Sequence, residues 1–489
     1  MKMDGQPDAG LPAIVLRNSF FGMAGQLMIK VLSVLFSILV VRRLGDVGYG
    51  KYSFILAYVG IFAVFSQMGM GPYTVREIAK GKTRTRFLFW NTLALRLVLS
   101  AITIVLTTGS AHLLGYSPAI VAGVFIASLG LLLQAVQRPF NGIMVGSERL
   151  DYQAKVQVAK QLVFVLLGTI LLLLGGRYVG LLVASLGGVA VMTLLSARIV
   201  LRGYDVGPVA IQPRRWSGLL RASIPFGVVG LATMMSYKID TIFLSFYHGD
   251  AVVGWYAAPY NLIMMLMIIS HSINQSLYPS LTRRYAEDAG AVGRVFGRVL
   301  KYLLIISLPV AMGATILARP IVFALYGEAF EHSTVALQVL IWVLPAMFLT
   351  DLFGHTAMAM GNERDVARVN AVSAGFNVTL NLLLIPSYGL VGAAITTVLT
   401  ELVEIVQYCF LLRDEFEAVS LRDVLVKPLA ASLVMSALVW VARGEHLLLT
   451  VGMGAAAYVG CVVLTGAVDR AETRFLGGLL LRRAAAEVR

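Results

Sequence analysis

Long runs of uncharged, mostly apolar residues alternate with short polar segments along the whole chain, for example at 118–137 and 447–468. A helix needs about 20 such residues to cross a hydrocarbon layer of about 30 Å. The pattern therefore predicts an all-α integral membrane protein with about 14 transmembrane helices. The expected spans are 19–41, 52–71, 87–111, 118–137, 156–174, 178–197, 222–247, 252–279, 302–318, 334–360, 369–386, 389–412, 428–442 and 447–468.

Composition narrows the class of protein further. Of the 489 residues 58% are hydrophobic and 13% charged, with a mean hydropathy of +0.81, whereas soluble proteins carry about 25% charged residues. No gap between spans exceeds about 25 residues, which leaves no room for a soluble catalytic domain. We expect no enzyme, no catalytic residues, no metal site and no cofactor. The first apolar stretch is long enough to remain as a span instead of being cleaved. Cys409 and Cys461 lie in apolar segments and are interpreted as small core residues.

The net charge of +14 would suggest nucleic acid in a soluble protein. In a membrane protein basic residues gather in cytoplasmic loops. With both termini placed inside, about 30 of the 40 Lys and Arg residues lie on the cytoplasmic side; Arg138 is counted among these loop residues. We therefore expect a multi-pass protein of the cell membrane, with membrane lipid and not nucleic acid as its surroundings.

The sequence repeats itself at an offset of about 204 residues. The matches include a Gly-Asp-x-x-x-Gly-x-Tyr motif between the first and second spans of each half. Its residues are Gly45, Asp46, Gly50 and Tyr52 in the first copy, and Gly249, Asp250, Gly254 and Tyr256 in the second. Six spans per repeat give both halves the same orientation. The predicted organisation is 1–213, 214–418, and 419–489 with two further helices and a basic tail.

The first copy of the motif also approximates a phosphate-binding P-loop. Tyr52 stands where such a loop needs Ser or Thr for magnesium, and Trp255 replaces Lys51 in the second copy. A P-loop also needs a parallel sheet, and none fits here. We interpret the motif as a structural turn whose aspartate caps the following helix.

The arrangement of six, six and two spans, the repeated motif and the segment from Tyr237 to Leu244 resemble the polysaccharide-transporter branch of the multidrug/oligosaccharidyl-lipid/polysaccharide flippase superfamily, the Wzx-type flippases. The resemblance covers nearly the whole chain. It implies a V-shaped, two-lobed helical bundle with a central cavity that opens alternately to each side. It also implies a polyprenyl-diphosphate-linked oligosaccharide as cargo, with glycan-assembly proteins as partners.

Charged residues within the spans are costly in hydrocarbon and are typical of functional cavities. The candidates for a cavity are Lys30, Arg96, Lys238 and Asp240. The three cations among them would offset the desolvation of a diphosphate. Lys160 can extend its side chain to the inner interface. The alternative is a set of buried structural pairs. Lys238 and Asp240, two residues apart, cannot share a helix face.

Polar stripes supply further candidates. The amides with helical spacing are Asn370, Asn377 and Asn381, and a second stripe holds His271, Asn274 and Gln275. These side chains are suited to bind glycan hydroxyls, and they are equally suited to form hydrogen bonds between helices. Asp351 and His355 share one face, as do Glu401 and Glu404. A proton or sodium coupling site at Asp351 with Glu401 or Glu404 is our hypothesis; the alternative is an ion pair to Lys238 or an arginine.

Three other functions compete with flipping. An exporter of small cationic drugs would favour an anionic cavity, but the first half carries Lys30 and Arg96 and no carboxylate within a span. A membrane glycosyltransferase, polymerase or ligase would need a long outer loop, and the longest, at 319–333, is short. A scaffold that transports nothing would have no use for the deep charges.

Overall fold

The structure is a computed structural model that describes residues 11–466 except 81–84, 148, 205, 288, 417–419 and 421. Side chains are described from residue 32 onward, apart from those of 79–80, 150, 279–280, 282–292, 294 and 423. The described residues form helices and turns and no strand, and the fold is all-helical as predicted. The chain divides into two compact units, Met1–Ala257 and Ala258–Arg489.

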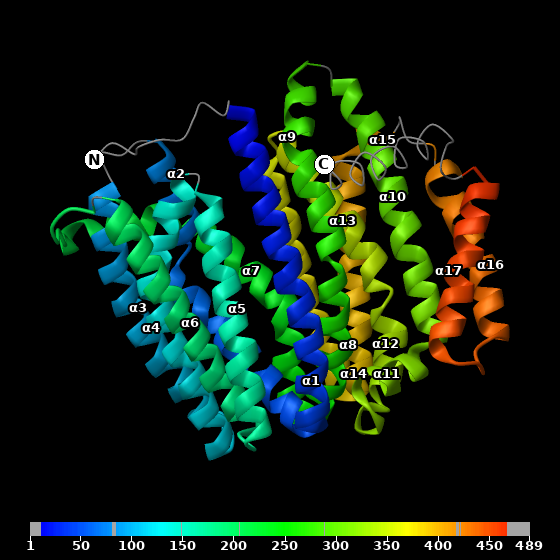
Figure 1. The fold of residues 1–489 in the computed structure, drawn as a ribbon, viewed down its shortest axis with the longest axis horizontal. Coiled ribbons are helices and arrows are strands. Elements are labelled where there is room, and N and C mark those ends of the chain that lie inside the picture. The colour runs from blue at the N-terminus through cyan, green and yellow to red at the C-terminus, as the bar shows by residue number, and fades with distance from the viewer. Residues whose placement is uncertain are drawn as a thin grey trace, which may run out of the picture. The chain divides into compact units, whose positions relative to one another are not determined.

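The first unit is built from helices of 24 residues and more, joined by short turns. Its helices are α1 (Leu11–Gln67), α2 (Met70–Lys80), α3 (Thr85–Leu113), α4 (Pro118–Gly146), α5 (Leu150–Leu173), α6 (Arg177–Gly203), the 3-10 turn η2 (Pro213–Arg215), α7 (Trp216–His248) and the start of α8 (Asp250–Leu266). The shorter elements are α2 with 11 residues, η2 with three and α8 with 17. α3 packs on α4, α4 and α5 both pack on α6, and α1 packs on α5 (Figure 1).

The second unit continues from α8 with shorter, more frequently broken helices. They are α9 (Ile268–Glu287), α10 (Ala289–Ile316), α11 (Ala318–Tyr326), η3 (Glu328–Phe330), α12 (Ser333–Leu340), α13 (Val343–Ala359), α14 (Glu363–Leu411), α15 (Arg413–Phe416), the π-turn η4 (Arg422–Val426), α16 (Lys427–Val441) and α17 (Leu447–Leu464). α13 packs on α9 and α14, and α16 packs on α10 and α17.

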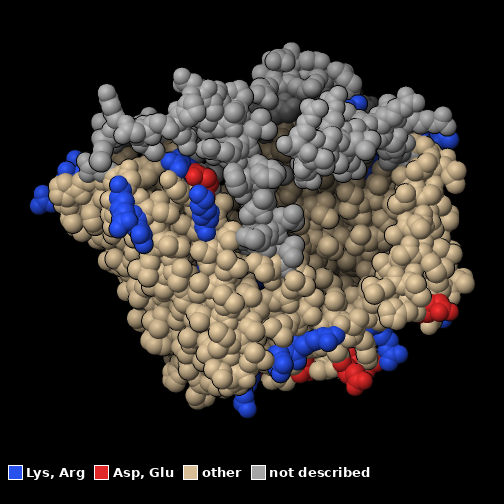
Figure 2. Space-filling view, in the orientation of Figure 1, with Lys and Arg blue, Asp and Glu red and all other residues tan. Residues whose placement is uncertain are grey.

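Twelve helical segments of the described chain are long and apolar enough to cross a membrane. Two of them contain a non-helical glycine, Gly45 in α1 and Gly389 in α14, at the boundaries that the sequence predicts between neighbouring spans. On the face shown in Figure 2, charged side chains gather at the ends of the helices and leave a broad uncharged band between them. This is the surface expected of a membrane-spanning protein. The number 14 and the predicted lobe boundaries stay predictions.

One predicted helix end is wrong. The sequence places Arg138 in a loop after residue 137, but α4 continues to Gly146 with Pro139 inside it. A proline is tolerated in a membrane helix where neighbouring helices pack against it, and Pro139 is buried. Arg138 is therefore a residue of the helix.

The two copies of the repeated motif share an unusual backbone conformation. Gly45 has φ 66° and ψ −177°, and Gly249 has φ 82° and ψ −174°. Residues with a Cβ are essentially excluded from this region. In each copy the glycine lets the chain end one helix and start the next without a loop.

The second glycine of each copy packs against the other copy. A Cβ on Gly50 would overlap the carbonyl oxygen of Asp250 and lie 2.7 Å from its carbonyl carbon. A Cβ on Gly254 would likewise overlap the carbonyl oxygen of Asp46 and lie 2.9 Å from the carbonyl carbon. The two helix starts thus approach each other reciprocally, at a separation that only glycine allows.

The Asp46 carboxylate joins the two copies and does not form the helix cap that the sequence predicts. Oδ2 accepts a hydrogen bond from Trp255 Nε1 at 3.1 Å, and Oδ1 accepts one from the neighbouring amide of Val47 at 2.7 Å. A capping aspartate would instead accept from the amide two or three residues on. The side chain is drawn away because the second copy of the motif lies beside it.

Asn91 in α3 fixes the segment between α6 and α7. The side chain is fully buried. Its Nδ2 donates to the carbonyls of Phe87 and Ala210 at 2.9 Å each. Its Oδ1 accepts from Gln212 N at 2.7 Å and Trp216 Nε1 at 3.1 Å. This one amide holds both the connecting segment and the start of α7.

Replacing Asn91 with leucine is expected to lower the free energy of unfolding by about 2–4 kcal/mol, because buried partners lose their hydrogen bonds. The measurement is thermal unfolding of the purified protein in detergent. Thr379→Val is the matched control, because Thr379 Oγ1 is exposed and bonds only a carbonyl of its own helix. Equal melting temperatures for the two variants would contradict the role given to Asn91.

A hydrogen bond connects α17 to α10. Tyr458 in α17 donates to the carbonyl of Ile305 at 2.7 Å. That carbonyl is four residues before Pro309, which lies inside α10 and has no amide hydrogen to offer it. Beside this contact α10, α11, α16 and α17 line an apolar cavity of about 350 Å³ that includes Gly313, Met435 and Gly454.

Candidate functional site

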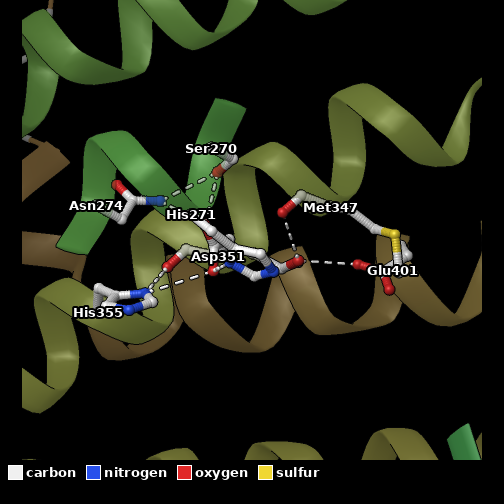
Figure 3. Close-up of polar contacts among 8 residues, drawn as sticks. Ser270, His271, Asn274, Met347, Asp351, His355 and Glu401 are labelled. Carbon is white, nitrogen blue, oxygen red and sulfur yellow. Dashed lines mark hydrogen bonds and ion pairs between the residues drawn. The ribbon is translucent and has the colours of Figure 1, made fainter. Parts of the chain in front are cut away.

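Asp351, in the middle of α13, is the centre of a polar cluster within the second unit (Figure 3). Oδ2 accepts hydrogen bonds from Ser270 Oγ at 2.6 Å and Asn274 Nδ2 at 2.7 Å. Oδ1 lies 2.9 Å from Nδ1 of His271. The carboxylate is only 9% exposed. Both of its oxygens are therefore engaged in an otherwise apolar bundle.

The partners of Asp351 come from one turn of α9. Ser270 and Asn274 are four residues apart and share a face, and both are buried. His271 follows Ser270 and is 54% exposed. The helix break at Met267 separates α8 from α9 just before this turn. One side of the cluster is therefore sealed by packed side chains, and the histidine provides its accessible side.

His355 adds a second imidazole from α13 itself. Its Nδ1 lies 2.8 Å from the carbonyl oxygen of Asp351 and 3.4 Å from Oδ1 of the same residue. Both imidazoles thus lie beside the carboxylate of Asp351. Asn274 Oδ1 is buried without a hydrogen-bond partner.

Glu401 of α14 lies beside this cluster and does not contact it directly. Its Oε2 accepts a hydrogen bond from Thr350 Oγ1 at 2.9 Å, and Thr350 precedes Asp351 in α13. Glu404 is half-buried one turn further on. Tyr408 lies within electrostatic range of all three carboxylates. Glu401 is thus one residue removed from Asp351 through Thr350, and a shared ion site of Asp351 with Glu401 or Glu404 stays a prediction.

The predicted asparagine stripe of α14 faces inward. Asn381 Nδ2 donates to Asn377 Oδ1 at 2.9 Å, and Asn377 Nδ2 donates to Thr400 Oγ1 at 3.1 Å. Both asparagines are buried, whereas Asn370 is half-buried. The pair binds the two halves of α14 together across the break at Gly389. Contact of the stripe with a glycan stays a prediction.

The deep charges of the first unit are in different environments. Lys30 lies in α1, but its side chain is outside the described residues. Asp240 in α7 is buried and accepts hydrogen bonds from Tyr256 Oη, Thr241 Oγ1 and the Thr241 amide. Lys238 is half-buried, and Arg96 is almost fully buried. Their predicted part in a cavity stays a prediction.

Sequence reasoning missed three residues of these clusters: Ser270, Thr350 and Tyr256 as a ligand of Asp240. Hydroxyl groups within apolar spans are too common to stand out singly. The spacing of Ser270 and Asn274 on one face was the available signal. Their link to Asp351 depends on which helices pack together, and that is absent from the local pattern.

No larger cation site is visible among the side chains described. These side chains contain no group of three or more His, Cys, Asp or Glu residues arranged to hold a metal ion.

Comparison with known proteins identifies relatives over most of the chain. A probable low-salt glycan biosynthesis flippase of Haloferax volcanii is 23% identical over 73% of this chain and 75% of its own length. The probable flippase AglR of the same organism is 26% identical over 40% of this chain, and that match spans only 42% of AglR. The lipid II flippase MurJ of Bacillus subtilis is 23% identical over 65% of this chain and 64% of its own.

Solved structures show the same fold. The lipid II flippase MurJ in an inward closed conformation has a TM-score of 0.76 at 13% identity, over 91% of this chain and 98% of that one. An inward-facing MATE family transporter of the MOP superfamily has a TM-score of 0.63 at 16% identity, over 81% and 99%.

Two family profiles match the sequence. The MatE profile matches residues 225–383. The profile described as polysaccharide biosynthesis protein matches residues 15–284, more than half of the chain. The chain therefore belongs to the polysaccharide biosynthesis protein family, within the flippase superfamily that its sequence resembles.

Proposed function

We propose that the protein moves a polyprenyl-diphosphate-linked oligosaccharide from the cytoplasmic to the outer leaflet of the cell membrane. The match to a glycan biosynthesis flippase over 73% of the chain carries this proposal. Transport proceeds by alternating access, with both termini on the cytoplasmic side, and supplies glycan-assembly proteins on the outer face. The chain acts as a transporter and catalyses no bond change in its cargo.

The Asp351 cluster is the proposed coupling site. A proton or a sodium ion bound at Asp351, with Ser270 and Asn274 as neighbours, would cancel the carboxylate charge in the bundle. Loss of that ion would leave an uncompensated buried charge, which is costly in this environment. Two states of different energy are what an ion gradient needs to drive a conformational change.

Reconstitution of the purified protein in liposomes with a labelled lipid-linked oligosaccharide tests the function. We expect the label to become accessible on the opposite leaflet faster than in protein-free vesicles. Collapse of either the proton or the sodium gradient should slow the accumulation of the label. A flipping rate that does not change when either gradient is collapsed would contradict the coupling site. A rate no faster than in protein-free vesicles would contradict the flippase proposal.

A small-molecule exporter is the second candidate, because the MatE profile matches residues 225–383. Export of a cationic drug by the same vesicles, without movement of the oligosaccharide, would favour it. The basic residues deep in the first unit make this the weaker candidate, since like charges repel a cationic cargo.

A further inference from the structure

Three basic side chains of the first unit lie at the same depth on adjacent helices. They are Arg96 in α3, Arg138 in α4 and Lys160 in α5. Because consecutive helices run in opposite directions, α3 begins, α4 ends and α5 begins on the same side. At about 1.5 Å per residue, the three positions lie roughly 12–16 Å from that side. The three residues therefore lie about two to three turns inside their helices and not in the connecting loops.

Arg138 is the central member of the group, because α4 packs on both α3 and α5. The charge of Arg138 bears on Arg96 and also on Lys160. None of the three is paired with a carboxylate among the residues that the structure describes. Arg149, nearer the end of α4, behaves differently, because Asp151 accepts two hydrogen bonds from it at 2.9 and 3.0 Å. Basic side chains that lie close together without a carboxylate partner, one of them buried, favour the binding of an anion from outside the chain.

Arg96 is the buried member of the group. It is 3% exposed, and its Nε has no hydrogen-bond acceptor. Its Nη2 lies 3.8 Å from the position that a Cβ on Gly71 would occupy, at the first turn of α2. The first amides of a helix lack acceptors within it, and that end carries a partial positive charge. The guanidinium of Arg96 and the N-terminus of α2, both of which bind anions, therefore lie close together.

Arg138 and Lys160 are the accessible members. Arg138 is exposed and Lys160 is half-buried. Polar residues extend from each along its helix: Gln134 and Asn141 flank Arg138, and Gln157 lies one turn from Lys160. Asn141 Oδ1 is buried without a partner. The two cations can bind a phosphate, and the amides beside them can form hydrogen bonds with hydroxyl groups next to that phosphate.

We propose that Arg96, Arg138 and Lys160, with the N-terminus of α2, form a binding site for a phosphate or diphosphate group. Charge-assisted hydrogen bonds from the two guanidinium groups hold the phosphate oxygens. The ammonium group of Lys160 balances the remaining charge. The group belongs to the lipid-linked cargo or to the headgroup of an anionic membrane lipid. Its assignment to the cargo rests on the proposed function, whereas the anion site stands without it.

The test measures binding by the full chain in detergent, with three probes: inorganic pyrophosphate, phosphatidylglycerol, and a polyprenyl diphosphate without sugar. A ligand that binds the folded protein raises its melting temperature with concentration. We expect pyrophosphate to stabilise the wild type, and the Arg138→Gln/Lys160→Gln variant to bind it at least tenfold more weakly. Arg368→Gln is the control, since Arg368 is exposed and paired with Asp365.

The outcomes separate the sources and the proposals. Polyprenyl diphosphate binding without phosphatidylglycerol binding supports the site as one for the cargo, and equal binding of both supports it as a general phosphate site. No response of the wild type to any probe, or equal affinity in the double variant, overturns the site. Oligosaccharide flipping is scored separately in vesicles. If it fails while pyrophosphate binding depends on Arg138 and Lys160, the flippase proposal falls and the anion site remains.

Discussion

Gly254→Ala is expected to prevent accumulation of correctly folded protein. The new methyl group would overlap the carbonyl oxygen of Asp46, which is a backbone atom and not the end of a flexible side chain. Overpacking costs about 1–3 kcal/mol where flexible side chains can adjust. The obstacle here is backbone, so we expect a loss of more than about 3 kcal/mol. Gly50→Ala should behave in the same way against Asp250.

The measurement is the monodisperse fraction in size-exclusion chromatography and the melting temperature of what remains. Gly60→Ala is the control, because it lies in α1 as Gly50 does and a Cβ there meets no atom within 4 Å. Alanine is the better helix former, so this control should be neutral or slightly stabilising. Wild-type yield and stability of Gly254→Ala would show that the two helix starts are not held at this separation.

Asp351→Asn is expected to reduce ion-driven flipping at least tenfold. The carboxylate accepts from Ser270 and Asn274 on one oxygen and faces His271 on the other. An amide offers one acceptor oxygen and turns an NH₂ group toward existing donors. It also removes the negative charge that a proton or sodium ion would neutralise.

Flipping in vesicles with an imposed gradient, compared with flipping without one, measures this effect. The variant should lose the gradient-dependent part of the rate and keep the rate measured without a gradient. Asp365→Asn is the matched control, because Asp365 is paired with exposed Arg368 at the start of α14. Undiminished stimulation by a gradient in Asp351→Asn would exclude Asp351 as the coupling residue.

The fold class could be predicted from the sequence because backbone amides and carbonyls in a membrane must be hydrogen-bonded within the protein. Long apolar segments satisfy this condition as helices. Helix ends were less predictable. Arg138 and Pro139 together predict that the helix ends in a solvent-exposed loop, yet α4 continues through both residues. The local sequence pattern does not show which helices pack against this segment and allow it to contain a charged residue and a proline.

The repeat predicted which glycines are equivalent and could not predict that they touch. An offset of 204 residues relates Gly50 to Gly254 by position in the chain, whereas their reciprocal approach is a property of packing. The same limit applies to the Asp351 cluster. His271 and Asn274 were assigned to a glycan stripe and Asp351 to ion coupling, because sequence spacing relates residues only within one helix. Packing of α9 on α13 unites them.

The hydrogen bond from Tyr458 to the carbonyl of Ile305 bears on how far the chain can be shortened. Pro309 leaves that carbonyl without a donor in α10, so the last helix completes the bonding of an earlier one. Removal of α16 and α17 would leave a polar oxygen facing apolar surroundings, at a cost of about 1–3 kcal/mol, and would uncover the apolar residues around the cavity. The hairpin of α16 and α17 is thus a structural part of the second unit, and a shortened chain that keeps α10 fully hydrogen-bonded must include it.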